Sequence, residues 1–180
     1  SMDFDWVHNW DLARECVQGV LKETDIDPAQ IAAVSTTCMR EGIVLYDKDG
    51  NEIWACANVD ARANDEVAEL IHTYPGLEKE LYLESGQTYA LGALPRLLWV
   101  KDKMPEVYEK TAEIGMFNDW LIRKLTGVEA IEPSNGSTTG IFDLQSRTWD
   151  PSIAEKCGLR GDIFPPVAEP GTIIAKVSAK

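Results

Sequence analysis

The pattern of apolar positions in the first quarter of the chain predicts a helix, a turn and a buried strand. From Asn9 to Lys22, apolar residues recur at the spacing of a helix with one buried face. Pro28 then stands at the first position of a short helical turn, which proline tolerates well. The β-branched run from Ile31 to Cys38 is typical of a strand that is buried on both faces.

A β-hairpin is expected next. Ile43–Tyr46 and Glu52–Cys56 are strand-like, and the residues between them contain Asp49-Gly50, a pair that favours the positive φ of a tight turn.

Helical and strand-like segments alternate over the rest of the chain, without repeats, which indicates an α/β domain. We expect helices over 60–72, 77–84, 95–104, from 105 onward, over 119–125 and over 149–157, and strands over 113–117, 140–144 and 172–177. Three glycines stand where helices should end, at Gly86, Gly127 and Gly158.

The two ends of this pattern differ from those of a complete α/β sheet. The chain opens on a helix without a preceding strand, and the strand predicted over 172–177 has no evident partner. We therefore expect an exposed sheet edge that would support self-association or strand exchange.

Composition narrows the class of partner. The 180 residues are 44% hydrophobic and 26% charged, as in an ordinary soluble globular protein. A formal net charge of -13 disfavours binding to nucleic acid, which requires clustered Lys and Arg, and binding to an anionic membrane surface. We expect neither partner.

The cysteines indicate a reducing compartment. The chain has four, without a C-x-x-C pair, and it contains neither a signal peptide nor a long apolar run. We expect reduced, mostly buried thiols in a cytoplasmic protein.

Charged residues that follow the predicted strand 31–38 are candidates for ligand contact. Arg40 and Glu41 come directly after it, and ligands of open α/β sheets lie beyond the carboxyl ends of strands. A guanidinium that donates and a carboxylate that accepts suit the hydroxyls of a sugar. On these two residues alone, an exposed ion pair is the favoured interpretation.

Further polar residues lie at predicted helix starts. Asp60 with Arg62, and Asn118 with Asp119, stand where helix capping is a sufficient explanation. Residues 133–138 are expected to form a loop or one helical turn, and the small polar residues over 134–140 favour a flexible loop over a loop that lines a ligand cleft. The sequence contains no glycine-rich phosphate motif and no His or Cys cluster with metal-ligand spacing.

The order and spacing of these stretches over nearly the whole chain resemble the FGGY family of carbohydrate kinases. The resemblance is carried by Met39-Arg40-Glu41-Gly42, Asp60-Ala61-Arg62-Ala63, Gly86-Gln87-Thr88, Pro95-Arg96-Leu97-Leu98-Trp99, Asn118-Asp119-Trp120-Leu121, Glu132-Pro133-Ser134-Asn135, Phe142-Asp143-Leu144 and Trp149-Asp150.

The resemblance implies an actin-like, ribonuclease-H-like α/β fold in which two domains enclose a cleft. Residues 1–180 would be the substrate-side part of the N-terminal domain, without its first strands and without the ATP-binding domain. The implied reaction transfers the γ-phosphoryl group of ATP, with Mg²⁺, to a hydroxyl of a small polyol or sugar-like substrate.

The resemblance also implies a set of substrate-binding residues. The family's substrate pair corresponds to Arg40 and Glu41, and the wider set is Met39, Arg40, Glu41, Asn58, Asp60, Arg62 and Asp119. Asn58 stands where sugar kinases of the family often carry Trp, which indicates a more branched or more hydrated substrate than a typical pentulose.

The family's phosphate-binding turn and catalytic Asp have no counterpart in the sequence. We therefore expect no catalytic residue, no bound ATP or Mg²⁺ and no kinase activity from this chain alone. Two alternatives stay open, namely a non-catalytic module that binds a polyol or a protein, and a kinase of the same family for another substrate such as xylulose or glycerol.

Overall fold

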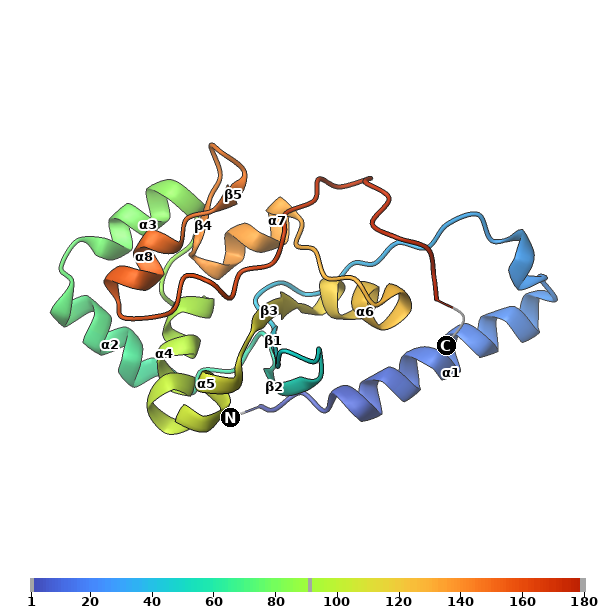
Figure 1. Cartoon of the computed structure of the whole chain (residues 1–180), viewed down its shortest axis with the longest axis horizontal. Coiled ribbons are helices and arrows are strands. Elements are labelled where there is room, and N and C mark those ends of the chain that lie inside the picture. Colours follow the sequence, from blue (N-terminus) through green and yellow to red (C-terminus); the bar gives the residue numbers. More distant parts are fainter. Residues whose placement is uncertain (1, 91, 179–180) are drawn as a thin grey trace.

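The computed structural model describes residues 2–90 and 92–178 (Figure 1). The helices are α1 (Trp6–Thr24), α2 (Asn64–Thr73), α3 (Leu77–Ser85), α4 (Ala93–Lys103), α5 (Pro105–Lys110), α6 (Phe117–Thr126), α7 (Pro133–Gly136) and α8 (Pro151–Lys156), with short 3-10 turns η1 (Pro28–Gln30) and η2 (Ser137–Thr139). The strands are β1 (Ile43–Tyr46), β2 (Glu52–Cys56), β3 (Glu113–Met116), β4 (Phe142–Asp143) and β5 (Thr148–Trp149).

A three-stranded antiparallel sheet in the order β2-β1-β3 occupies the centre. The β1–β2 hairpin is confirmed, and Gly50 in its turn has a φ of 81°. Every residue of the central strand β1 is buried, because layers of side chains cover both faces of the sheet.

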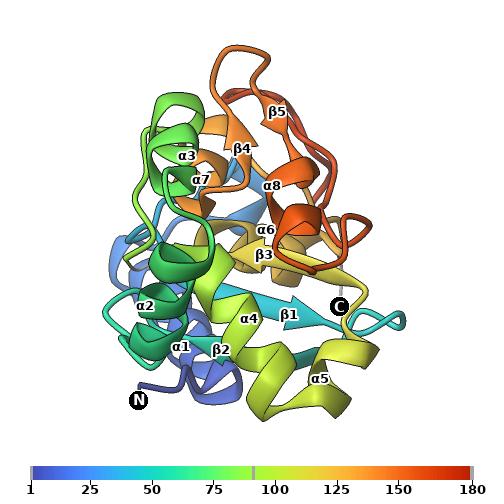
Figure 2. The same ribbon diagram turned by 90° about the vertical axis from the view of Figure 1, so that its left-hand side faces the viewer.

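Alternation along β1 divides the core in two. Ile43 and Leu45 point to a large cluster that includes residues of α3, α4 and α8, whereas Val44 and Tyr46 point to a smaller one with Trp120 of α6. Figure 2 shows α4 on one side of the sheet and α6 on the other. Trp120 lies within the smaller cluster and is 3% exposed.

Segments outside the strands hydrogen-bond to both outer edges of the sheet. The amide of Phe4 donates to the carbonyl of Ala55 in β2 at 3.3 Å, and the amide of Ile114 in β3 donates to the carbonyl of Ile163 at 2.9 Å. Self-association through these edges stays a prediction, and it would have to displace the segments that now lie there.

Two predicted strands do not form. Residues 31–38 and 172–177 are extended but lack ladder partners among the described residues, and Ile173 is 89% exposed. Strand β5, which was not predicted, pairs with β4. An apolar run specifies a strand only where a neighbouring strand accepts its backbone hydrogen bonds.

Helix α1 forms as predicted, but the expectation that one of its faces is buried is wrong. Trp6 and Trp10 pack against the smaller core, whereas Leu12, Val17 and Val20 are exposed. In Figure 1 the helix runs away from the body of the molecule. None of its residues is buried, so its apolar face does not pack into the core of the described residues.

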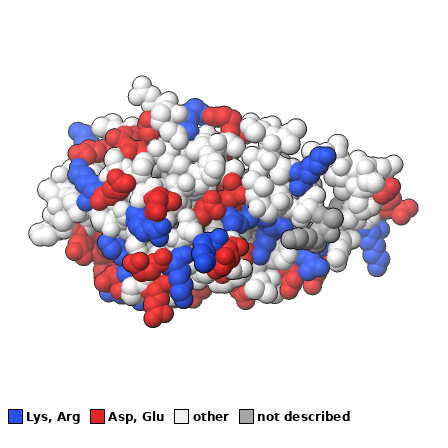
Figure 3. Space-filling model, in the orientation of Figure 1, with Lys and Arg blue, Asp and Glu red and all other residues white. Residues whose placement is uncertain are grey.

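Charges are interspersed over the surface. Figure 3 shows Lys and Arg among Asp and Glu on the visible face, without a continuous basic patch. Among the described residues, no helix combines the length and hydrophobicity that a bilayer crossing requires.

Candidate functional site

Two of the predicted substrate stretches meet around the side chain of Arg96. Helix α4 places this residue in the interior, where it is 1% exposed. Its Nη1 donates to the backbone carbonyl of Glu41, and its Nη2 donates to the carbonyls of Asn58 at 2.7 Å and Asp60 at 2.9 Å. The turn at Glu41 and the segment after β2 are thereby joined through one guanidinium.

The backbone of Glu41 is held in an uncommon conformation. Its φ of 72° lies in the left-handed region, which costs a non-glycine residue on the order of 1 kcal/mol. The Glu41 carboxylate accepts a hydrogen bond from Gln87 Nε2 at 3.4 Å, and the same nitrogen donates to the carbonyl of Thr138 at 3.2 Å. Contacts to both its backbone and its side chain therefore orient Glu41.

Gly42 brings this turn close to α6. A Cβ atom at Gly42 would lie 2.5 Å from Cε2 of the Phe117 ring, so only glycine permits the approach.

Met39 and Arg40 extend from the same turn into solvent. Met39 is 68% exposed, and its sulfur accepts a long contact from Asn58 Nδ2 at 4.0 Å. Arg40 is exposed. The sequence favoured an ion pair between Arg40 and Glu41, and that interpretation is wrong, because none of the ion pairs among the described residues joins these two side chains. The contact between Met39 and Asn58 thus brings the loop after β2 beside the turn that carries Arg40 and Glu41.

Asp60 and Arg62 are occupied by each other. The Asp60 carboxylate accepts from the backbone amide of Arg62 at 2.9 Å, from its Nε at 2.8 Å and from its Nη2 at 2.8 Å. Burial alone would raise the pKa of Asp60, but these bonds and one from the Met2 amide hold the pKa well below its usual range.

The same pair fastens three segments. The Arg62 guanidinium lies 5.3 Å from the ring centroid of Trp54 and 4.9 Å from that of Trp99, and it also binds Asp3 at 2.5 Å. Asp60 does not cap α2, which begins four residues later with Ala63 as its N-cap, so that interpretation is wrong. Direct contact of either residue with a substrate stays a prediction.

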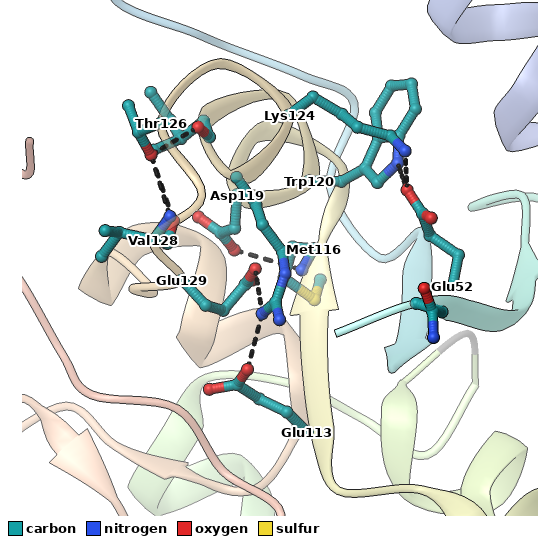
Figure 4. Close-up of polar contacts among 12 residues, drawn as sticks. Glu52, Glu113, Met116, Asp119, Trp120, Lys124, Thr126, Val128 and Glu129 are labelled. Atoms are coloured by element: carbon teal, nitrogen blue, oxygen red, sulfur yellow. Dashed lines mark hydrogen bonds and ion pairs between the residues drawn. The ribbon is translucent and has the colours of Figure 1, made fainter. Parts of the chain in front are cut away.

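Asp119 caps α6, as predicted. Its Oδ2 accepts from the backbone amide of Met116 at 3.1 Å, and the residue is 3% exposed (Figure 4). Burial raises the pKa of Asp119 to about 8, although the Met116 amide lowers it and the charge of Glu132 raises it further. Among the described residues, this carboxylate makes no hydrogen bond or ion pair with Met39, Arg40, Glu41 or Asn58.

Two acidic side chains are buried at α6, those of Asp119 and Glu129. Burial and the charge of Asp119 raise the pKa of Glu129 to about 8, although Arg123 Nη1 lies 3.2 Å from its carboxylate. Arg123 also binds Glu113 at 2.6 Å. The contacts of Arg123 with Glu113 of β3 and with Glu129 hold α6 against the sheet.

The helical turn expected as one alternative for 133–138 forms as α7 and continues into η2. Residues 134–140 are therefore a mostly buried turn and not a flexible loop. Oxygens of Glu132 cap α7 by accepting from the amides of Asn135 at 2.6 Å and Ser134 at 2.9 Å. The side chain of Asn135 then donates to Asn118 Oδ1 and to the Cys38 sulfur at 3.7 Å. This turn therefore braces the residues directly before Met39.

Arg96 was absent from the predicted site residues. The signal that would have found it is a charged residue in an otherwise apolar stripe, because five other residues of α4 are buried alongside it. Gln87 likewise lay within a matched stretch without an assigned role.

Two cavities among the described residues lie away from the Glu41 turn. One of about 340 Å³ is lined by α2, α4 and Cys157, and another of about 430 Å³ lies between the hairpin turn and α5. Within the described part of the chain, no three His, Cys, Asp or Glu residues are arranged to hold a metal ion.

The four thiols are unpaired. Cys56 and Cys157 are buried, Cys38 is half-buried, and Cys16 is exposed rather than buried.

Residues 2–180 match the N-terminal domain of the FGGY family of carbohydrate kinases. This chain belongs to that family. It is 51% identical over 180 residues to an autoinducer-2 kinase of Enterobacter sp. (strain 638), covering 99% of the chain and 34% of that protein. It is 48% identical to the autoinducer-2 kinase of Salmonella typhimurium over the whole chain and again 34% of the relative. The chain thus spans about a third of the length of these relatives.

Solved structures confirm the predicted actin-like fold of the family. Xylulose kinase from Rhodospirillum rubrum superposes with a TM-score of 0.87 at 22% identity, covering 98% of this chain and 36% of that one. Plasmodium falciparum glycerol kinase with ADP gives a TM-score of 0.75 at 23% identity, covering 83% and 31%. At such identities the likeness concerns the fold alone.

Proposed function

We propose that the chain forms the substrate-side part of an ATP-dependent kinase for a small polyhydroxylated molecule. The proposed substrate is the open-chain form of the quorum-sensing signal autoinducer-2. The support comes from relatives of that name at about half identity and from the stretches Met39–Tyr46 and Trp54–Ala63, which strongly resemble autoinducer-2 kinase. Phosphorylation would trap the signal inside the cell.

One observation carries the proposal, namely the joint placement of Arg40, Glu41 and Asn58 on loops that meet at Arg96. Arg40 offers donors to a hydroxyl oxygen, the Glu41 carboxylate accepts from a hydroxyl, and the Asn58 amide does both. Such a set holds adjacent hydroxyls in a fixed orientation, and orientation supplies much of the rate in phosphoryl transfer.

ATP and Mg²⁺ would supply the phosphoryl group and neutralise its charge. The described residues offer neither a glycine-rich phosphate turn nor a cluster of metal ligands, so we assign these groups no position in this chain. We propose that the chain alone has no kinase activity, which an assay of ADP release by residues 1–180 would check.

The test is a comparison of substrates and variants in the full-length protein that contains this chain. ADP release is measured with autoinducer-2, xylulose and glycerol, and autoinducer-2 should give the highest kcat/KM. Glu41→Gln and Arg40→Met should each weaken binding in calorimetry roughly 10- to 100-fold, as expected for a lost hydrogen bond to a charged group.

Lys79→Met, at an exposed position of α3, is the matched control and should leave the affinity unchanged. Unchanged affinity in Glu41→Gln would remove Glu41 from the site. Faster turnover of xylulose or glycerol would refute the proposed substrate, and binding without ADP release from any of the three would indicate a non-catalytic module.

A further inference from the structure

The guanidinium of Arg96 is buried without a counter-ion. No carboxylate of the described residues lies within ion-pair distance of it, and its side chain is almost fully enclosed. Burying an unpaired charge is unfavourable, and a Leu or Met at this position would fill similar space without that penalty. Packing alone therefore does not explain an arginine here.

The partners of Arg96 indicate what the charge does. All three acceptors are backbone carbonyls, and they belong to Glu41, Asn58 and Asp60. Two of these residues carry the side chains that we place against the substrate. The guanidinium thus binds the peptide groups beneath the binding side chains rather than the side chains themselves.

A planar fork of donors suits this arrangement. The Nη1 group donates to the carbonyl of Glu41, while the Nη2 group donates to the carbonyls of Asn58 and Asp60. The width of the guanidinium therefore sets the separation between the Glu41 turn and the segment that contains Asn58. A lysine ammonium has donors that diverge from one point and holds such a separation less rigidly.

The conformation of Glu41 adds an independent reason. A left-handed glutamate persists only where its surroundings hold it, and the Arg96 contact falls on the carbonyl of that same residue. Without the contact, the peptide after Glu41 is free to rotate toward a more favourable conformation, which would re-aim the carboxylate.

We propose that Arg96 is a positioning residue that sets the spacing between the Glu41 turn and the Asn58 segment, and through it the selectivity for the polyol. This proposal rests on the proposed function. It assigns Arg96 no contact with the substrate, since its Nη1 and Nη2 groups donate to the protein backbone and its Nε is buried.

The experiment uses the full-length protein and three variants. Arg96→Met removes all donors, Arg96→Lys keeps the charge, and Val100→Ala removes buried volume from the same helix without removing a side-chain hydrogen bond. Arg96→Met should raise KM for the polyol roughly 10- to 100-fold while KM for ATP stays within twofold. Arg96→Lys should restore part of the loss, and Val100→Ala should lower Tm with KM unchanged.

Hydrogen exchange gives a readout that does not depend on catalysis. Amides of residues 41–43 and 58–60 should lose protection in Arg96→Met and keep it in Val100→Ala. An equal loss in both variants, or a polyol KM of a folded Arg96 variant within twofold of wild type, would overturn the role of Arg96. Absence of phosphorylation by the wild-type protein would instead overturn the proposed function, and exchange would then still decide whether Arg96 organises the two loops.

Discussion

The carboxylate of Asp60 and the guanidinium of Arg62 face each other as a two-pronged ion pair, with one oxygen 2.8 Å from Nε and the other 2.8 Å from Nη2. The side chains are 0% and 7% exposed, so the pair forms in the interior. Two charges that resemble binding residues in the sequence therefore neutralise each other in the fold.

Loss of the Asp60 charge should destabilise the protein more than it impairs binding. Asp60→Asn leaves the buried Arg62 with only the exposed Asp3 as an anionic partner, and breaking such a pair typically costs about 3 kcal/mol or more. Urea unfolding near neutral pH measures the loss. Asp65→Asn, at an exposed position in the first turn of α2, is the control and should be near neutral.

The same pair should make stability depend on acid. The fold lowers the pKa of Asp60, so its contribution is present above the ordinary Asp value of about 4 and is lost as pH falls through the lowered value. The wild-type protein should therefore lose more stability below pH 4 than Asp60→Asn does. Parallel losses in the two proteins would contradict this assignment.

Glu129 should have the opposite effect on the pH dependence. Its pKa is raised to about 8, so the folded state binds more protons than the unfolded state between about pH 4.3 and 8. Its contribution is therefore full below that range and is lost as pH rises through it. Glu129→Gln should flatten the decline in unfolding free energy from pH 5 to 8.5, whereas Glu109→Gln, at an exposed site on α5, should leave the slope unchanged.

The close approach of Glu129 to β3 can be tested at Gly115. A Cβ there would collide with Glu129 Oε1 and would lie 3.0 Å from the Tyr46 ring. Gly115→Ala should cost about 1–3 kcal/mol, and less in a Glu129→Ala background, where the colliding group is gone. The control is Gly19→Ala in the exposed helix α1, which meets nothing within 4 Å and should stabilise slightly. Additive costs in the double variant would exclude the proposed collision.

The thiols should differ sharply in reactivity. Cys16 is exposed, whereas Cys56 is fully buried and burial raises its pKa to about 11. Iodoacetamide at pH 8 should alkylate Cys16 first and Cys56 only after unfolding, as read by peptide mass spectrometry. Cys16→Ser should abolish the fast phase, and rapid modification of Cys56 in the native protein would contradict its placement in the core.

The sequence predicted correctly those elements that are stabilised by contacts between neighbouring residues. The hairpin around Gly50 and the helix end at Gly127 depend on a few adjacent residues, and both were predicted correctly. The strands expected at 31–38 and 172–177 failed because burial depends on a partner surface that a local pattern does not encode. The role of Arg96 was missed for the same reason, since its three acceptors lie 36 to 55 positions away in sequence.

The placement of α1 gives one continuous helix two unequal halves. Trp6 and Trp10 pack its first turns against the smaller core, whereas Val17 and Val20 are exposed. Helical segments without packed contacts open and close rapidly, because local propensity alone holds them. The backbone amides in the second half of α1 should therefore exchange with solvent long before those of the sheet. A partner that covered this half would slow their exchange.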